Sequence, residues 1–127
     1  MNKLKVLVVD DEDDFCELVV KRLINSKMDA EGVKNGILAM EILKQRDFDV
    51  VVLDVKMPDI GGIEVLRWIK ANKPGVEVIM LTGGVSVEDG ITGMQLGAFD
   101  YVIKPAPMNE LVDKVRQAYE KKMEQGA

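Results

Sequence analysis

Polar residues that could handle a phosphate group stand directly after several short apolar runs of this 127-residue chain. Carboxylates are the hard oxygen ligands that Mg²⁺ prefers, and a carboxylate can also act as a nucleophile that forms an acyl phosphate. An ammonium and a hydroxyl beside them would meet the remaining need, because phosphoryl transfer depends mainly on positioning and charge neutralisation. These residues are Asp10, Asp11, Asp54, Thr82 and Lys104.

The apolar runs that precede these residues have the composition of buried strands. All but one are continuous and rich in Val, Ile and Leu, as parallel strands covered on both faces are. The run at residues 28–33 is weaker. The sequence therefore predicts strands at Val6–Val9, Met28–Val33, Val50–Leu53, Val76–Leu81 and Tyr101–Ile103.

Segments with helical periodicity separate the predicted strands. In the last of them, apolar residues recur at spacings of three and four from Met108 to Met123, after a proline suited to a first helical turn. The segment at residues 87–96 contains Gly90 and Gly93, which each cost about 0.5–1 kcal/mol relative to alanine inside a helix. We therefore expect this fourth helix to be the least stable, with Gly97 as a left-handed cap at its end.

The alternation of strands and helices predicts an α/β fold. Five strand–helix repeats with short connections favour a doubly wound, five-stranded parallel sheet with helices on both faces. The carboxyl ends of such strands meet at one edge, where ligands bind. Asp10, Asp11, Asp54, Thr82 and Lys104 are therefore expected to share one cleft. Two carboxylates about 4 Å apart repel by roughly 4 kcal/mol at an effective dielectric of 20, so this cleft needs positive charge.

Each of these residues also has an ordinary structural interpretation. An aspartate after a strand is usually a turn residue or a helix N-cap, and Thr82 before Gly83 is by itself typical of a loop. Lys104 before Pro105 is uninformative alone. The joint pattern favours a site, because every one of these residues stands at the carboxyl end of its own predicted strand.

Composition excludes several classes of function. The chain has no histidine, which removes His-ligated zinc, Ser–His–Asp hydrolysis and a role as a phosphohistidine carrier. The net charge of −5 and the lack of a basic run argue against direct binding of nucleic acid. No apolar run approaches the roughly 20 residues that span a membrane. The single Cys16 suits a reducing compartment, so we expect a cytoplasmic location.

Along nearly its whole length the chain resembles the receiver domain of bacterial response regulators, the phosphorylated partners in two-component signalling. The resemblance implies a flavodoxin-like sheet with the strand order 2-1-3-4-5 and a single receiver domain over residues 1–127. Four segments in the right order carry it, and together they are far more specific than any one alone. They are Val6–Glu12, Val51–Pro58 with Gly62, Leu81–Gly83, and Gly97–Pro105.

The resemblance also implies how phosphate would be handled. Asp54 would accept a phosphoryl group from a partner histidine kinase or phosphotransfer protein. Mg²⁺ would be bound directly by Asp11, Asp54 and the backbone carbonyl of Lys56, with Asp10 acting mostly through water. Lys104 would pair with the phosphoryl oxygens. The chain would thus be a phosphoprotein of a phosphorelay that modifies only itself.

The same resemblance implies a switch. Thr82 would move toward the phosphoryl group, Tyr101 would turn inward behind it, and the Lys104–Pro105 peptide bond would be cis. These movements would reshape the face made by the fourth helix, fifth strand and fifth helix, with the glycine-containing fourth helix as the bistable element. That face would bind an output protein or domain, and it could also form a homodimer.

Two positions depart from the commoner family pattern and affect the expected lifetime of the acyl phosphate. Lys56 stands where many relatives have a short side chain, and its ammonium would either shield the phosphoryl group from water or lie in solvent. Gly84, two residues after Thr82, offers no side chain near the site.

Three other readings compete with the receiver interpretation. Asp11, Glu12 and Asp13 superficially resemble the paired aspartates of haloacid-dehalogenase-like phosphatases, but they leave the strand-end Asp54 unexplained. A nucleotide- or flavin-binding module lacks support, because acidic residues replace the glycine-rich phosphate loop after the first strand. A pseudo-receiver that only docks a partner conflicts with the intact Asp54, Thr82 and Lys104. Whether the chain acts alone or within a longer regulator stays open.

Overall fold

One parallel sheet organises the computed structural model, which describes residues 3–83 and 87–125. Its strands are hydrogen-bonded in the order β2-β1-β3-β4-β5, and all four neighbouring pairs are parallel. The predicted fold class and strand order are confirmed. The strands are β1 (Lys5–Val9), β2 (Asp29–Val33), β3 (Val50–Asp54), β4 (Glu77–Gly83) and β5 (Asp100–Lys104).

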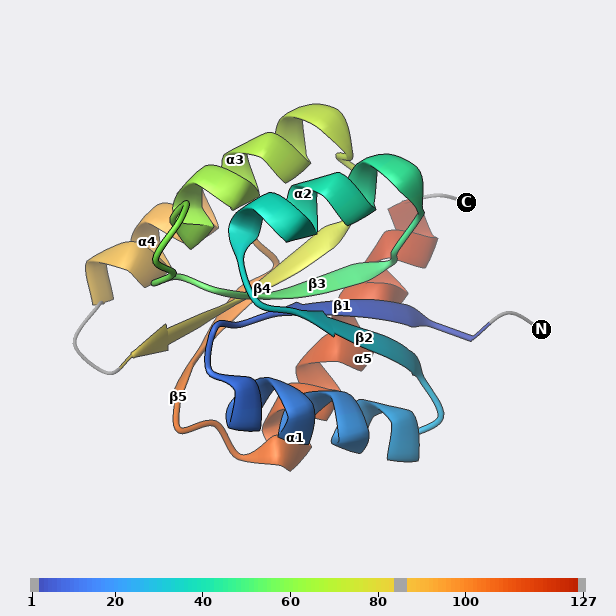
Figure 1. Ribbon diagram of the computed structural model, residues 1–127. Coiled ribbons are helices and arrows are strands. Elements are labelled where there is room, and N and C mark those ends of the chain that lie inside the picture. Colours follow the sequence, from blue (N-terminus) through green and yellow to red (C-terminus); the bar gives the residue numbers. More distant parts are fainter. Residues whose placement is uncertain (1–2, 84–86, 126–127) are drawn as a thin grey trace.

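Helices cover both faces of this sheet, and Figure 1 shows α2, α3 and α4 on one side with α1 and α5 on the other. None of the helices in the described part of the chain is long and apolar enough to cross a membrane. The helices are α1 (Asp13–Asn25), α2 (Gly36–Gln45), α3 (Gly62–Asn72), α4 (Val87–Gln95) and α5 (Met108–Gln125).

The central strands supply two separate cores. In β1, Val6 and Val8 pack with the α1 and α5 side chains, whereas Leu7 and Val9 pack with those of α2 and α3. Successive residues of a strand point to opposite faces, so a strand covered on both sides must be apolar throughout. This is why the central strands are continuous apolar runs in the sequence.

The observed strand ends differ from the predicted ones because a prediction from apolar runs leaves out polar residues at the ends of strands. The fourth strand was expected to end at Leu81, but it continues to Gly83, so that Thr82 pairs with Ile103 inside the sheet. The edge strand β2 begins at Asp29 and is mostly exposed, which explains its weak apolar signal. Backbone pairing, and not side-chain character, fixes these ends.

The two glycines inside α4 have a packing reason. A Cβ atom added at Gly90 would lie 3.2 Å from the Tyr101 ring, and one at Gly93 would lie 3.2 Å from Met80 Cγ. The glycines therefore let α4 approach the sheet closely. Gly97 has a φ of +102°, which confirms the left-handed conformation expected after this helix. The low stability expected for α4 stays a prediction.

Candidate functional site

The predicted site residues converge at the carboxyl edge of the sheet. Asp10 follows β1, Asp54 ends β3, and Thr82 lies near the end of β4, one residue beyond the partner of Asp54. Asp10 is 0% exposed, Thr82 2% and Asp54 6%. Lys104, the last residue of β5, pairs with Gly83. Buried polar groups of this kind need partners, because burial of an uncompensated charge is costly.

The Lys104 ammonium is the centre of this cluster. Its Nζ lies 2.7 Å from Glu12 Oε1, 2.8 Å from Asp10 Oδ2 and 3.6 Å from Asp54 Oδ2. It also lies 4.7 Å from the centroid of the Phe15 ring, within the range of a cation–π interaction. Carboxylates from β3 and from the segment between β1 and α1 thus meet at the ammonium of a β5 residue.

Negative charge nevertheless exceeds positive charge at this edge of the sheet. Oxygens of Asp10, Glu12 and Asp54 lie within 4.8 Å of one another, and among the residues that the structure describes only Lys104 is in ion-pair contact with all three carboxylates. Asp10 Oδ1 accepts a hydrogen bond from the Glu12 N–H at 2.9 Å. Asp10 Oδ2 is buried and has no hydrogen bond of favourable geometry among the described residues, although it lies 2.8 Å from the Lys104 ammonium.

This donor set fits a small divalent cation. Hard carboxylate oxygens that converge on one point, one of them buried and without a hydrogen bond, are the ligands that Mg²⁺ takes in proteins. Three carboxylates face one ammonium, so a divalent cation would offset the remaining negative charge.

The electrostatics of the cluster perturb Asp54. Burial raises the pKa of Asp54 from 3.8 to about 6, and the charges of Asp10 and Asp11 act in the same direction. Lys104 and a hydrogen bond from the backbone of Lys56 oppose the increase in this pKa without cancelling it. A perturbed carboxyl group in a cleft with a specific charge partner is typical of a functional site.

The Lys104 ammonium is held in its charged form. Burial acts to lower the pKa of Lys104, but the close contacts of its ammonium with Asp10 and Glu12 outweigh burial, with help from the charge of Asp54, so this pKa lies above its ordinary value. A permanent positive charge therefore faces the buried carboxylates at neutral pH.

Asp11 and Lys56 lie at the outer side of the cleft. Both are exposed, and they line a hollow of about 480 Å³ together with Met57, Pro58 and residues at both ends of the same loop. Asp11 does not belong to the compact set of carboxylates, although its charge acts on Asp54. The predicted ligand role of Asp11, and that of the Lys56 carbonyl, stay predictions.

Sequence reasoning missed two contributors to the site. Glu12 is in the segment that carries the family resemblance, yet it was given no role, and it makes the shortest contact with Lys104. Phe15, whose ring lies beside the Lys104 ammonium, was likewise given no role in the site. The available signal for Glu12 was a third acidic residue directly before a helix, where it occupies the N-cap position of α1 without a capping hydrogen bond from its side chain.

Tyr101, the proposed switch residue, lies beside α4. Its half-buried ring packs against Gly90, and its backbone pairs with Met80 in β4. Because alternate strand residues share a face, Thr82 points to the same side of the sheet as Met80 and Tyr101. The Lys104–Pro105 peptide bond is cis, as the resemblance implied. Gly84 lies outside the described residues.

The fold and the cleft define a doubly wound α/β domain with an acidic site at the carboxyl edge of its sheet, and comparison with known proteins gives its family. The family model of the response regulator receiver domain matches residues 6–116. The chain is 39% identical over 111 residues to the probable transcriptional regulatory protein TcrX of Mycobacterium tuberculosis, which covers 87% of this chain and 47% of TcrX. It is 30% identical over 113 residues to the transcriptional regulatory protein CusR of Escherichia coli, with 89% of this chain and 50% of CusR covered.

Solved structures agree. A response regulator receiver domain protein from Clostridium thermocellum superimposes with a TM-score of 0.90 at 30% identity, covering 94% of this chain and 97% of that one. The receiver domain of Francisella response regulator 1452 gives a TM-score of 0.87 at 29% identity, covering 94% and 98%. This chain belongs to the response regulator receiver domain family. It spans about half the length of the curated relatives TcrX and CusR.

Proposed function

We propose that this chain is a phosphoryl-accepting signalling switch in which Asp54 takes a phosphoryl group from a partner histidine kinase or phosphotransfer protein. The observation that carries the proposal is the buried Asp54 carboxylate, 3.6 Å from the permanently charged Lys104 at the open edge of the sheet. A receiver domain is modified on its own aspartate and turns over no separate substrate. A site formed by the ends of strands is compatible with such a reaction.

The chemistry follows from these groups. A carboxylate oxygen of Asp54 attacks the phosphorus of a phosphohistidine on the partner, an O–P bond forms, and the P–N bond to the imidazole breaks. The departing imidazole nitrogen keeps the electron pair and takes up a proton. Lys104 stabilises the charge on the phosphoryl oxygens, because its Nζ already lies beside the attacking carboxylate.

We further propose that Mg²⁺ is held by Asp10, Asp11, Asp54 and the backbone carbonyl of Lys56. The cation would neutralise charge on the phosphoryl oxygens and on the carboxylates around them. Glu12 competes for Lys104 in this structure, at 2.7 Å, so Lys104 must loosen that contact as it turns toward the phosphoryl group. The Glu12 side chain is mostly exposed, so it can give up its contact with Lys104 and turn into solvent.

The output of the switch would be the surface of α4, β5 and α5. Thr82 and Tyr101 point to the α4 side of the sheet, so movement of Thr82 toward the phosphoryl group would free space for the Tyr101 ring. Ile91, Met94 and Ile103 are exposed large apolar side chains on α4 and β5. Such side chains suit a partner contact, either an output protein or domain or a second copy of this chain.

The direct test is phosphorylation by a small donor. The protein is incubated with Mg²⁺ and acetyl phosphate, and its intact mass is measured. We expect a single phosphoryl adduct on the wild type and none on Asp54→Asn, with circular dichroism showing that both are folded. An adduct of undiminished yield on Asp54→Asn, or none on the wild type, would overturn the proposal.

A further inference from the structure

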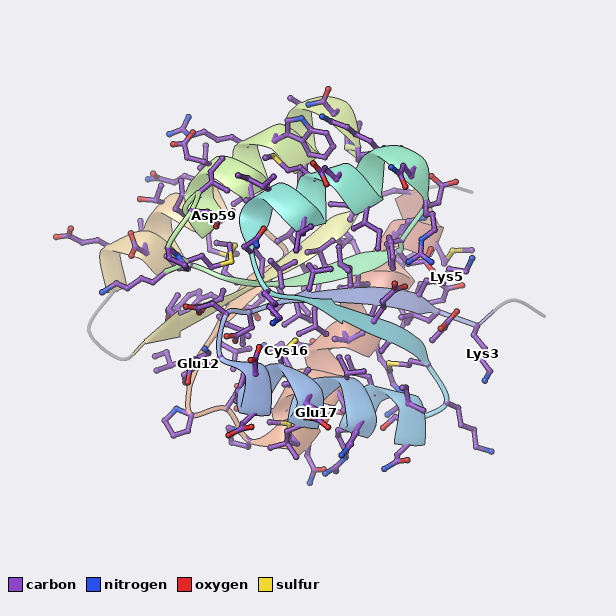
Figure 2. The ribbon with its side chains drawn as sticks, in the orientation of Figure 1. Lys3, Lys5, Glu12, Cys16, Glu17 and Asp59 are labelled. Atoms are coloured by element: carbon purple, nitrogen blue, oxygen red, sulfur yellow. The ribbon has the colours of Figure 1, made fainter. Side chains whose placement is uncertain are left out.

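A carboxylate outside the acidic cleft ties two distant parts of the chain together. Asp59, in the loop between β3 and α3, accepts hydrogen bonds from the backbone N–H groups of Gly36 at 3.3 Å and Ile37 at 3.0 Å. These donors are the first residues of α2, more than 20 positions earlier in the sequence. Figure 2 shows Asp59 in that loop, beside the N-terminal end of α2.

These bonds complete the N-terminus of α2. The first N–H groups of a helix have no partner within it, and the helix dipole favours a negative charge there. Asn35 supplies acceptors for the next two positions, with its side chain 2.9 Å from the Leu38 nitrogen and its carbonyl oxygen 3.1 Å from the Ala39 nitrogen. Asp59 therefore supplies, from another segment, acceptors for the first two N–H groups of α2, which the N-cap residue Asn35 does not bond.

The charge of Asp59 is stabilised by this arrangement. Burial is the largest single influence and acts to raise the pKa of Asp59, but hydrogen bonds from the N–H groups of Ile37, Ile60 and Gly36 together outweigh it and hold this pKa below its ordinary value. The carboxylate is therefore ionised at neutral pH, and the contact with α2 is a charge-assisted one.

Close packing supports the same contact. A Cβ atom at Gly36 would lie 2.3 Å from Ile60 Cγ2 and 2.7 Å from Val65 Cγ2, so only glycine lets the loop rest on the start of α2. At the other end of the loop, the Gly62 N–H donates to the Val55 carbonyl at 2.8 Å. The loop of residues 55–61 is thus fixed both at its base and at its outer turn.

This loop carries the backbone that faces the nucleophile. Lys56 donates a backbone hydrogen bond that lowers the pKa of Asp54, and Lys56, Met57 and Pro58 line the hollow shared with Asp11. Asp59 does not touch the reacting atoms. Only Met57 and Pro58 separate it from Lys56, so a shift of Asp59 would pass along a short stretch of backbone.

We propose that Asp59 is a positioning residue that anchors the 55–61 loop to the N-terminus of α2 and so holds the Lys56 backbone against Asp54. The proposal rests on the proposed function for its role in phosphorylation, but its geometric part is separate. Loss of the tether would leave α2 in place and let the Lys56 peptide group drift away from the carboxylate.

The test compares Asp59→Ala with a matched control, Asn35→Ala. Both variants remove a side-chain acceptor from the same end of α2, so their melting temperatures should fall similarly. Only Asp59→Ala frees the loop. Two readouts apply to the unphosphorylated protein: hydrogen exchange at the Lys56 amide, and the Kd for Mg²⁺ by titration calorimetry.

We expect Asp59→Ala to speed exchange at Lys56 and to weaken Mg²⁺ binding by about tenfold, the effect typical of losing a residue that orients a metal ligand. Asn35→Ala should change neither. Asp59→Asn keeps only one of the two acceptor oxygens and no charge, so its exchange rate at Lys56 and its Kd for Mg²⁺ should lie between those of wild type and Asp59→Ala. Should Asp59→Ala fail to fold, the comparison of Asp59→Asn and Asp59→Ser with wild type takes its place.

Equal changes in the two alanine variants would overturn the proposal, because they would show that Asp59 only supports α2. Unchanged exchange at Lys56 in Asp59→Ala would also overturn it. Failure of the proposed function is distinguishable: a wild-type chain that takes no phosphoryl group from acetyl phosphate refutes phosphorylation, whereas exchange at Lys56 still measures the tether.

Discussion

The two ends of the sheet bury carboxylates in opposite ways. At the amino end, the single Glu77 carboxylate of β4, 3% exposed, has two ammonium partners, Lys70 of α3 at 3.5 Å and Lys121 of α5 at 3.8 Å. At the carboxyl end, the buried Asp10 and Asp54 share the single ammonium of Lys104, for which Glu12 also competes.

This difference separates a structural ion pair from the one that we propose to be functional. Glu77 joins helices from the two faces of the sheet, and its charge is fully compensated within the chain. The carboxyl end has more negative than positive charge. Burial first, and then the charge of Asp10, raise the pKa of Asp54, so its ionised form is disfavoured in the folded state. Proteins tolerate such destabilising arrangements where activity requires them. Opposite effects of neutralising the two ends should therefore reveal their different roles.

The largest effect is expected at the amino end. Glu77→Gln should destabilise the protein by about 2–3 kcal/mol, because it leaves Lys70 and Lys121 without a charge partner, although their partial exposure limits the loss. Urea unfolding measures this. The matched control is Glu64→Gln, which removes an exposed contact with Arg67 at 4.0 Å and should cost less than about 0.5 kcal/mol. Equal losses in the two variants would refute the distinction.

Neutralising a carboxylate at the carboxyl end should instead increase the stability of the protein. In the absence of divalent cations, Asp54→Asn should stabilise the protein on the order of 2 kcal/mol at pH 7, because it removes a buried charge that burial and Asp10 disfavour. The same urea unfolding, with a chelator present, measures it. A less stable Asp54→Asn variant would show that the cluster is balanced like the one around Glu77.

The pH dependence of this increase in stability follows from the pKa of Asp54. This pKa is about 6 in the folded protein and 3.8 ordinarily, so the folded state binds the proton more tightly. The contribution of Asp54 is therefore most favourable below the ordinary value and is lost as the pH rises toward 6. The stability difference between Asp54→Asn and wild type should widen from about pH 4 to pH 6 and then level off. A difference that narrows over this range would contradict the assigned direction.

Addition of Mg²⁺ should produce the smallest shift and should act at one end only. A ligand at ten times its Kd stabilises the folded state by about 1.4 kcal/mol. Wild type and Glu77→Gln should show the same increase in unfolding free energy, whereas Asp54→Asn should show little. A response that Glu77→Gln loses and Asp54→Asn keeps would place the cation at the wrong end of the sheet.

Sequence reasoning predicted the parts of the fold that depend on burial. The central strands are apolar on both faces, so their positions and the edge shared by Asp10, Asp54, Thr82 and Lys104 follow from composition and strand order. The edge strand β2 gave a weak signal because most of its side chains are exposed.

Contacts between side chains of distant segments could not be predicted. The contact of Glu12 with Lys104 joins positions 92 residues apart and depends on which rotamer reaches across the cleft. Asp59 is similar, because its bonds to α2 require the loop after β3 to fold back over a neighbouring element. An acidic residue after Pro58 has no periodicity that would mark it.

The most direct test of the central claim is to locate the phosphoryl group. The protein is treated with Mg²⁺ and acetyl phosphate, the acyl phosphate is reduced with borohydride, and the site is found by peptide mass spectrometry. Reduction converts an aspartyl phosphate into homoserine, and we predict homoserine at position 54 alone. Homoserine at Asp10, Asp11 or Asp59, or no conversion at any position, would contradict the account.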